Sequence, residues 1–228
     1  VPLKDMKTDL NRIKDAIDSK TRIIFLNNPL NPTGTIFKEA EFEDFIKEIP
    51  QNILVAVDEA YGEFAEDRDF PQSIRYTEKY PVLVLKTFSK AYALAGLRIG
   101  YCIGDASLIS YLERTRQPFS INSMALVAAR AALSDEGFLK KVLKNNRAGK
   151  AFFYEFFDSL SLEYVPSEAN FILVRLGHDA ESITKKLFEE KILVRWMGAY
   201  GLPEYIRVTI GNRKENKRFI EALRRLLR

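Results

Sequence analysis

Two residue types that build many catalytic and structural sites are nearly absent from this chain of 228 residues, which has one cysteine and one histidine. A single cysteine, Cys102, excludes an internal disulfide framework and is typical of a reducing compartment. The histidine, His178, stands in a polar Gly-His-Asp-Ala stretch. We therefore expect neither a metal centre nor a Ser-His-Asp relay.

Long apolar runs are absent as well. No stretch approaches the roughly 20 consecutive apolar residues of a transmembrane helix. The first residues, Val-Pro-Leu-Lys-Asp, lack the charged-then-apolar layout of a signal peptide. Hydrophobic residues make up 46% of the chain and charged residues 29%, the balance of a soluble globular protein. We expect a cytoplasmic protein without a membrane partner.

Positive charge is concentrated at one end of the chain. The last sixteen residues hold seven Lys or Arg and two Glu, a net charge of +5, whereas the whole chain carries +4. Apolar residues recur at helical spacing in the same stretch, so one face of a terminal helix would be buried and the other solvated. We favour this solvated basic face over a nucleic-acid-binding arm.

Short apolar runs alternate with helical patterns over most of the chain. The runs 22–26, 53–57, 82–85 and 99–103 are rich in β-branched residues, which predicts buried strands. A helical pattern over 38–49 separates the first two. Helical crossovers between such strands imply an α/β fold with a mostly parallel sheet.

A second, smaller α+β domain is expected at the C-terminal end. An alanine-rich helix over 123–134 and a long amphipathic helix over 136–160 lead into it. Strands over 170–175, 192–195 and 205–210 follow, with helices over 180–190 and at the end of the chain. We place the boundary near residue 147, giving a large domain 1–147 and a small domain 148–228.

Polar residues follow three of the predicted strands, at the edge where parallel sheets bind ligands. Asn-Pro-Leu-Asn-Pro-Thr-Gly ends at Gly34, Asp-Glu-Ala-Tyr spans 58–61, and Lys-Thr-Phe-Ser-Lys spans 86–90. Taken singly these residues have ordinary interpretations: Asp58 as a helix cap, the Asn-Pro-Thr-Gly stretch as a turn, Lys90 as a surface lysine and Arg98 as an ion-pair residue.

Taken together, these side chains match the needs of pyridoxal phosphate (PLP). A lysine amine, Lys90, can form a Schiff base with its aldehyde. A carboxylate, Asp58, can hold the proton of the pyridine nitrogen, so that the ring acts as an electron sink. Asn31 with Tyr61 can bind the ring hydroxyl. The phosphate would be bound by hydroxyl and guanidinium groups, those of Thr87, Ser89 and Arg98.

The motifs Asn-Pro-x-Asn-Pro-Thr-Gly, Asp-Glu-Ala-Tyr and Ser-Lys followed by Gly-x-Arg-x-Gly-Tyr resemble those of the fold-type I, class I and II aminotransferases. The resemblance implies that Lys90 is both the Schiff-base residue and a proton carrier, with Asp58 and Tyr61 beside it. It also implies a cis peptide bond before Pro32. In the C-terminal part it implies that Arg207 binds a substrate carboxylate and that Asn170 lies near the substrate.

Within that family the chain is most similar to the histidinol-phosphate aminotransferases, on the motifs already quoted and on Val194-Arg195 upstream of Ile206-Arg207. This similarity implies that Arg195 and Arg207 together receive a substrate phosphate. It further implies glutamate and 2-oxoglutarate as partner substrates in histidine biosynthesis, and a homodimer. Another amino-acid aminotransferase, a threonine-phosphate decarboxylase and a non-catalytic basic binding protein remain alternatives.

The family also has N-terminal pieces that these residues do not match. They are a first sheet strand, a glycine-containing phosphate loop, an aromatic residue stacked on the pyridine, and a tyrosine offered to the partner subunit. We therefore expect this chain to hold only part of the family's large domain.

Overall fold

The computed structural model describes residues 1–227 and divides them into two compact units. Unit 1 holds Val1–Asn31 and Thr35–Lys140, and unit 2 holds Pro32–Gly34 and Lys141–Arg228. The chain passes between the main parts of both units within α5, which spans Glu136–Ser159. The boundary expected near residue 147 falls in the same helix.

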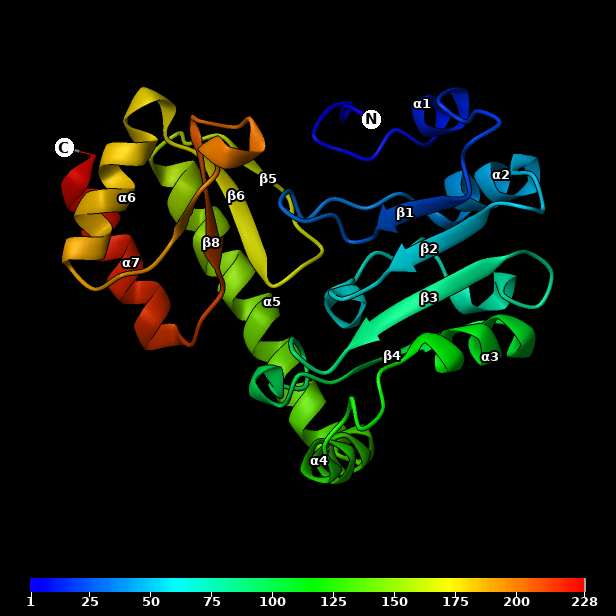
Figure 1. Ribbon diagram of the computed structural model, residues 1–228. Coiled ribbons are helices and arrows are strands. Elements are labelled where there is room, and N and C mark those ends of the chain that lie inside the picture. Colours follow the sequence, from blue (N-terminus) through cyan, green and yellow to red (C-terminus); the bar gives the residue numbers. More distant parts are fainter. Residues whose placement is uncertain (228) are drawn as a thin grey trace. The chain divides into compact units, whose positions relative to one another are not determined.

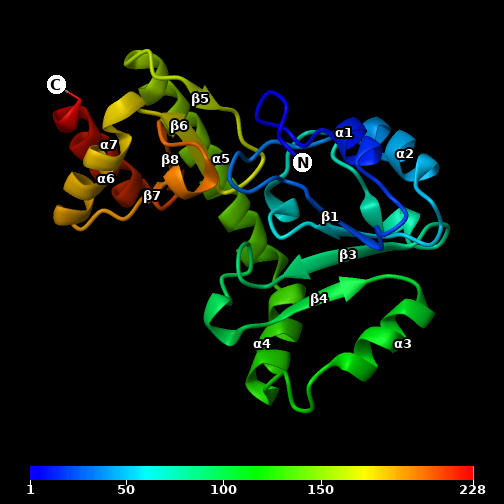
Figure 2. The same cartoon turned by 45° about the horizontal axis from the view of Figure 1, so that its top comes forward.

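Unit 1 is built on a four-stranded sheet with the order β1-β2-β3-β4. The first three strands are parallel, and their arrowheads point the same way in Figure 1. The fourth is antiparallel to the third, which Figure 2 shows plainly. The expected α/β fold with a mostly parallel sheet is therefore confirmed. The strands are β1 (Ile23–Asn27), β2 (Leu54–Asp58), β3 (Val82–Thr87) and β4 (Gly100–Ile103).

Helices of unit 1 pack against the face of the sheet that carries Ile24, Val55 and Val82. The crossover helix α2 (Glu39–Glu48) buries Phe42, Phe45 and Ile46 against the side chains of β1 and β2 that point to the same face. The short helix α1 (Leu10–Asp15) begins after Asp9, whose carboxylate caps it by accepting the N–H of Arg12. The other regular elements are α3 (Ala106–Thr115), α4 (Ser123–Ser134) and the 3₁₀ turns η1 (Gly62–Phe64), η2 (Ser73–Tyr76) and η3 (Ala95–Leu97).

A small separate core lies beneath the residues that follow β3. The alanine-rich helix α4 turns Ala125 and Ala129 toward Phe88 and Ile99, and all four side chains are buried. The small side chains let the helix approach closely. Phe88, the neighbour of Ser89, is thereby fixed in the interior.

Unit 2 consists of a four-stranded antiparallel sheet, ordered β5-β6-β8-β7, packed on helices (Figure 1). Aromatic residues of α5, among them Phe153 and Phe157, meet the apolar side chains of the sheet and of the two later helices. The remaining elements of this unit are β5 (Tyr164–Val165), β6 (Phe171–Arg175), η4 (Gly177–Asp179), α6 (Ala180–Glu189), β7 (Arg195–Trp196), η5 (Gly198–Tyr200), β8 (Tyr205–Thr209) and α7 (Arg213–Leu226).

The prediction of a strand over 192–195 is wrong for most of that stretch, because β7 spans only Arg195–Trp196. Lys191 adopts a left-handed conformation (φ 59°) that closes α6, and the N–H of Ile192 donates to the carbonyl of Leu187 at 2.9 Å. This helix-end hydrogen bond takes the backbone out of reach of β8. From this stretch Arg195, together with the following Trp196, pairs with β8.

The terminal helix α7 buries Phe219, Ile220 and Leu223, as its pattern predicts. Part of its basic face is paired, since Arg225 lies 2.6 Å from a carboxylate oxygen of Glu190. Within residues 1–227, none of the helices combines the length and the apolarity that crossing a bilayer requires.

Candidate cofactor site

The predicted cofactor residues of unit 1 gather at one edge of its sheet. Asn27, Asp58 and Leu85 are register partners in the three parallel strands, so the segments that follow these strands leave the sheet side by side. Arg98 reaches the same edge from the other direction, because it precedes the antiparallel strand β4.

Asp58 ends β2 and is held by its own turn. One of its carboxylate oxygens accepts the N–H of Ala60 at 2.9 Å, while its carbonyl accepts the N–H of Asn28 at 3.0 Å. The half-buried carboxylate borders a cleft of about 450 Å³, which Asn27 and Leu30 also line. A ligand atom with a proton to share would therefore find an oriented carboxylate here.

Lys90 and Tyr61 come from different segments and meet. The Lys90 ammonium lies 5.2 Å from the centre of the Tyr61 ring, within the range of a cation–π contact. Tyr61 is buried, whereas Lys90 is exposed. Buried Ala91 anchors the backbone next to the lysine, so the amine projects from a fixed base.

The hydroxyls and the guanidinium expected to bind phosphate are neighbours. Thr87 Oγ1 accepts the N–H of Ser89 at 3.1 Å, and Arg98 Nη1 lies 3.5 Å from Ser89 Oγ. The same nitrogen of Arg98 donates to the carbonyl of Ala95 at 2.8 Å. The donor set is that of an anion site.

Arg98 has a backbone conformation that residues other than glycine rarely adopt. Its φ of 52° and ψ of 48° place it in the left-handed region, at the end of η3. Such a conformation costs roughly 1–2 kcal/mol. Strained backbone conformations of this kind are concentrated at functional sites, and here the strained residue is the arginine whose guanidinium lies beside Ser89.

Asn31 is half-buried in the turn that follows β1, and the N–H of Leu30 donates to the carbonyl of Thr35 at 2.8 Å to close the turn. The cis peptide bond expected before Pro32 is wrong: within residues 1–227 the bond in that state is Asn28–Pro29. The two Asn-Pro bonds share the same weak trans preference, so the sequence alone could not decide between them.

Unit 2 brings two predicted substrate residues together. Arg195 on β7 and Arg207 on β8 are direct register partners, so both side chains lie on one face of the sheet. The Arg207 guanidinium lies 4.9 Å from the centre of the Phe171 ring, and that of Arg195 lies 5.3 Å from the Tyr200 ring. Asn170 precedes Phe171, and its carbonyl accepts the N–H of Ile210 at 2.9 Å.

Sequence reasoning did not single out a buried ionic cluster behind the cofactor residues. Lys86 on β3 lies 2.9 Å from Glu59 and 3.4 Å from Glu63. Burial alone would lower the pKa of the Lys86 ammonium, but the two carboxylates outweigh it and hold that pKa above its usual value. The signal was present in the sequence, because Glu59 and Lys86 directly adjoin Asp58 and Thr87.

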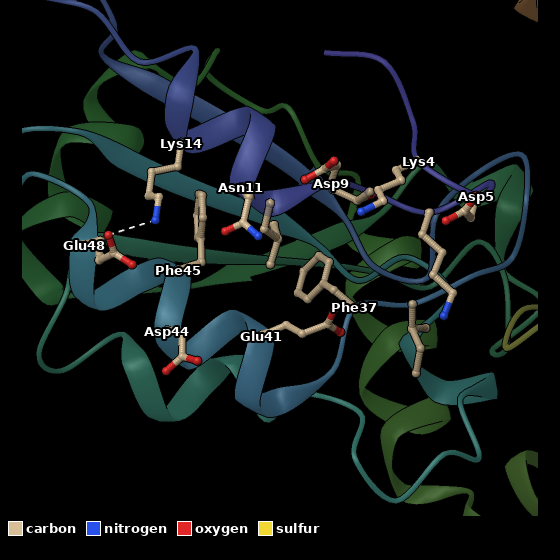
Figure 3. Close-up of a pocket in the computed structure, with 14 residues that line it drawn as sticks. Lys4, Asp5, Asp9, Asn11, Lys14, Phe37, Glu41, Asp44, Phe45 and Glu48 are labelled. Carbon is tan, nitrogen blue, oxygen red and sulfur yellow. Dashed lines mark hydrogen bonds and ion pairs between the residues drawn. The ribbon is translucent and has the colours of Figure 1, made fainter.

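A cleft of about 410 Å³ lies elsewhere in unit 1, between the N-terminal segment with α1 and the helix α2. Figure 3 shows its lining, with Lys14 donating to Glu48 at 2.9 Å across it. None of the predicted site residues, all of which are described, belongs to this lining. The side chain of His178, the one histidine of the chain, is 97% exposed.

The family model described as aminotransferase class I and II matches residues 1–223. The chain belongs to this family. Among relatives of this aminotransferase chain, histidinol-phosphate aminotransferase 2 of Pseudomonas fluorescens is 45% identical over 228 residues. Histidinol-phosphate aminotransferase 2 of Hydrogenovibrio crunogenus is 43% identical over 229 residues. Both alignments cover 100% of this chain but only 62% and 61% of the two relatives.

The aminotransferase fold is shared with solved structures. Histidinol-phosphate aminotransferase from Sinorhizobium meliloti, crystallised with pyridoxal-5'-phosphate, superposes with a TM-score of 0.91 at 29% identity. The match covers 100% of this chain and 63% of that protein. The expected fold, that of PLP-dependent fold-type I transferases, is confirmed. This chain spans somewhat less than two thirds of the length of these proteins.

Proposed function

We propose that this chain carries cofactor- and substrate-binding residues of a histidinol-phosphate aminotransferase. The reaction would convert histidinol phosphate and 2-oxoglutarate to imidazole-acetol phosphate and glutamate, in histidine biosynthesis. The observation that carries the proposal is the convergence of Lys90, Asp58 and the Ser89–Arg98 pair at one sheet edge, beside Tyr61.

The donor set of unit 1 fits PLP. The arginine Arg98 and the hydroxyl of Ser89 suit a phosphate, with Thr87 beside them. Asp58 offers a carboxylate suited to a protonated pyridine nitrogen, while Tyr61 and Asn31 can bind a ring hydroxyl. PLP, when bound, supplies an electron sink for negative charge that develops on the α-carbon of an amino acid.

The residues of the chain would divide the remaining work. The Lys90 amine would hold the cofactor covalently and would also carry a proton to and from the substrate. The Asp58 carboxylate would keep a proton on the pyridine nitrogen, because a negative charge close by favours the protonated form. The Arg98 guanidinium would bind the phosphate with two parallel hydrogen bonds, a geometry that lysine cannot offer.

The paired arginines of unit 2 support an anionic substrate. Like charges directly opposite each other on adjacent strands are destabilising. An anion bound between the two guanidinium groups would relieve this repulsion, and the relief would favour binding. Guanidinium groups suit carboxylate and phosphate equally, since both accept two parallel hydrogen bonds. Arg207 would receive the carboxylate of glutamate or 2-oxoglutarate, Arg195 and Arg207 together would receive the phosphate of the other substrate, and Asn170 would lie near either substrate.

The resemblance also implies a homodimer and a cytoplasmic location, which we propose with the function. Exposed apolar side chains on α4, including Met124 and Val127, support a partner surface of this kind.

The cofactor assignment is tested by reducing the purified chain with borohydride in the presence of PLP and mapping the labelled peptides. We expect a phosphopyridoxyl group on Lys90, and none at that peptide in Lys90→Ala. Label distributed over several surface lysines, unchanged by Lys90→Ala, would contradict the assignment.

The substrate assignment needs a separate competition experiment. Histidinol phosphate should protect Lys90 from labelling in the wild-type protein, and Arg195→Ala should weaken this protection more than it weakens protection by glutamate. Equal protection by phosphate-free amino acids other than glutamate, such as aromatic ones, would favour a different aminotransferase. Release of carbon dioxide without a requirement for 2-oxoglutarate would favour a decarboxylase.

A further inference from the structure

A buried charged cluster lies directly behind the candidate cofactor residues. It consists of Lys86, Glu59 and Glu63, and we call it the Lys86 cluster. Its side chains are 14%, 4% and 11% exposed, in that order. Charges so far removed from water are stable only when they are paired. One ammonium serves two carboxylates here, so both depend on Lys86.

Glu59 and Lys86 lie on the opposite face of the sheet from Asp58 and Thr87, because Glu59 follows Asp58 and Lys86 precedes Thr87 along the chain. Asp58 ends β2, and the N–H of Glu59 continues the ladder by donating to the carbonyl of Leu85 at 2.9 Å. Successive side chains of a strand point to opposite faces. Because Lys86 holds the Glu59 side chain on one face of the sheet, the Asp58 side chain points to the opposite face.

The same cation closes a turn around Tyr61. Glu59 and Glu63 stand two residues before and two residues after Tyr61, and Lys86 binds both. Within this turn the N–H groups of Gly62, Phe64 and Ala65 donate to the carbonyls of Glu59, Tyr61 and Gly62. A side chain at Gly62 would come within 3.1 Å of the Lys86 amine, so the backbone wraps closely round the charge.

We propose that Lys86 is a positioning residue which, through Glu59 and Glu63, fixes the turn presenting Asp58 and Tyr61 to the cofactor. The inference rests on the proposed function, because the orientation matters only if these residues bind PLP. Lys86 itself touches neither substrate nor cofactor in this scheme. It acts only through the two glutamates.

The first test follows the turn directly, in the full chain without cofactor. In Lys86→Met, hydrogen–deuterium exchange of the amides of residues 59–65 should accelerate about tenfold or more, because the turn would open locally. Exchange in β1 and in unit 2 should be unchanged. Lys86→Arg keeps the charge and should restore slow exchange. Unchanged exchange at 59–65, or equal acceleration throughout unit 1, would overturn the proposal.

Lys86→Met leaves two buried carboxylates without a cation and could prevent folding, so Glu59→Gln provides a milder variant. It keeps the size of the side chain and the Glu63–Lys86 pair but removes one charge of the cluster. Faster exchange confined to residues 59–62 would support the proposal. Wild-type exchange in this variant would contradict it.

The second test measures PLP affinity by fluorescence titration of the same proteins. Lys86→Met should bind PLP about tenfold or more weakly, with affinity recovered in Lys86→Arg. A loosened turn with wild-type affinity would refute the link to the cofactor. A wild-type protein that binds no PLP would instead count against the proposed function, and exchange at 59–65 would still decide whether Lys86 fixes the turn.

Discussion

At the scale of single residues, Gly34 shows how closely the Asn-Pro-Thr-Gly turn is packed. Its φ is +78°, and an added Cβ would lie 2.1 Å from the hydroxyl oxygen of Ser167, a residue of the same unit. The carbonyl of Gly34 also accepts the N–H of Glu168 at 2.8 Å. Glycine is required here both for the backbone conformation and for space.

Gly34→Ala should therefore lower the free energy of unfolding of unit 2 by about 2 kcal/mol or more. The single tryptophan, Trp196, lies in this unit and can report its unfolding in urea. Gly177→Ala is the matched control, since its φ is +71° but nothing lies within 4 Å of the added carbon. It should cost only about 1 kcal/mol. Equal losses in the two variants would disprove the steric argument.

Glu63 gives a pH dependence whose sign follows from its burial. Burial raises the pKa of the Glu63 carboxyl above its ordinary value of 4.5, against the opposing attraction of Lys86. The folded protein therefore binds this proton more tightly than the unfolded chain. The stability that the proton contributes is present below the unfolded pKa and is lost as pH rises through the folded one.

Glu63→Gln removes this titration and leaves a side chain of the same size. Relative to this variant, the wild-type protein should lose stability as pH rises from about 4.5 towards neutrality. Urea unfolding of both proteins across this range measures the difference. A difference that stays constant with pH, or grows in favour of the wild type, would contradict the assignment.

At the scale of elements, the sequence predicts best where burial is uniform along a run. The first three strands of unit 1 follow apolar runs, and α4 has the bounds that its alanine pattern predicts. β3, by contrast, continues past its apolar run through Lys86 and Thr87. Its last residues are polar because they face the candidate site and the Lys86 cluster. A search for apolar runs therefore ends the strand too early.

The elements that the sequence missed have local causes. α3 was not predicted, and none of its residues is fully buried. β5 and β7 have only two residues each, too few for a periodicity. The motifs indicated the candidate cofactor residues because their types are distinctive. Lys86, Glu59 and Glu63 were missed because a cluster of common charged residues becomes meaningful only when their distances are known.

At the scale of the whole molecule, the proposed homodimer can be tested on α4. Met124 and Val127 are 72% and 68% exposed there, close together on a helix that belongs to unit 1. Large apolar groups gathered on one exposed face are typical of a subunit interface.

In sedimentation experiments the wild-type chain should have twice its mass of 26.2 kDa. Val127→Glu should sediment as a single chain, because a buried unpaired charge is strongly disfavoured. Leu193→Glu provides the control, since Leu193 is an apolar residue of unit 2 that is 80% exposed. A single-chain mass for the wild type, or a dimer that survives Val127→Glu, would count against this surface.

The assignment of residues 32–34 to unit 2 has a consequence for how such proteins can be recombined. The chain leaves unit 1 after Asn31, returns to it at Thr35, and leaves it again after Lys140. A gene fusion with a single junction in α5 would therefore transfer unit 2 without its short N-terminal part. Gly34 and Ser167 would then come from different parents, and an incompatible pair would clash. We expect these two positions to be inherited together, however far apart they lie in the gene.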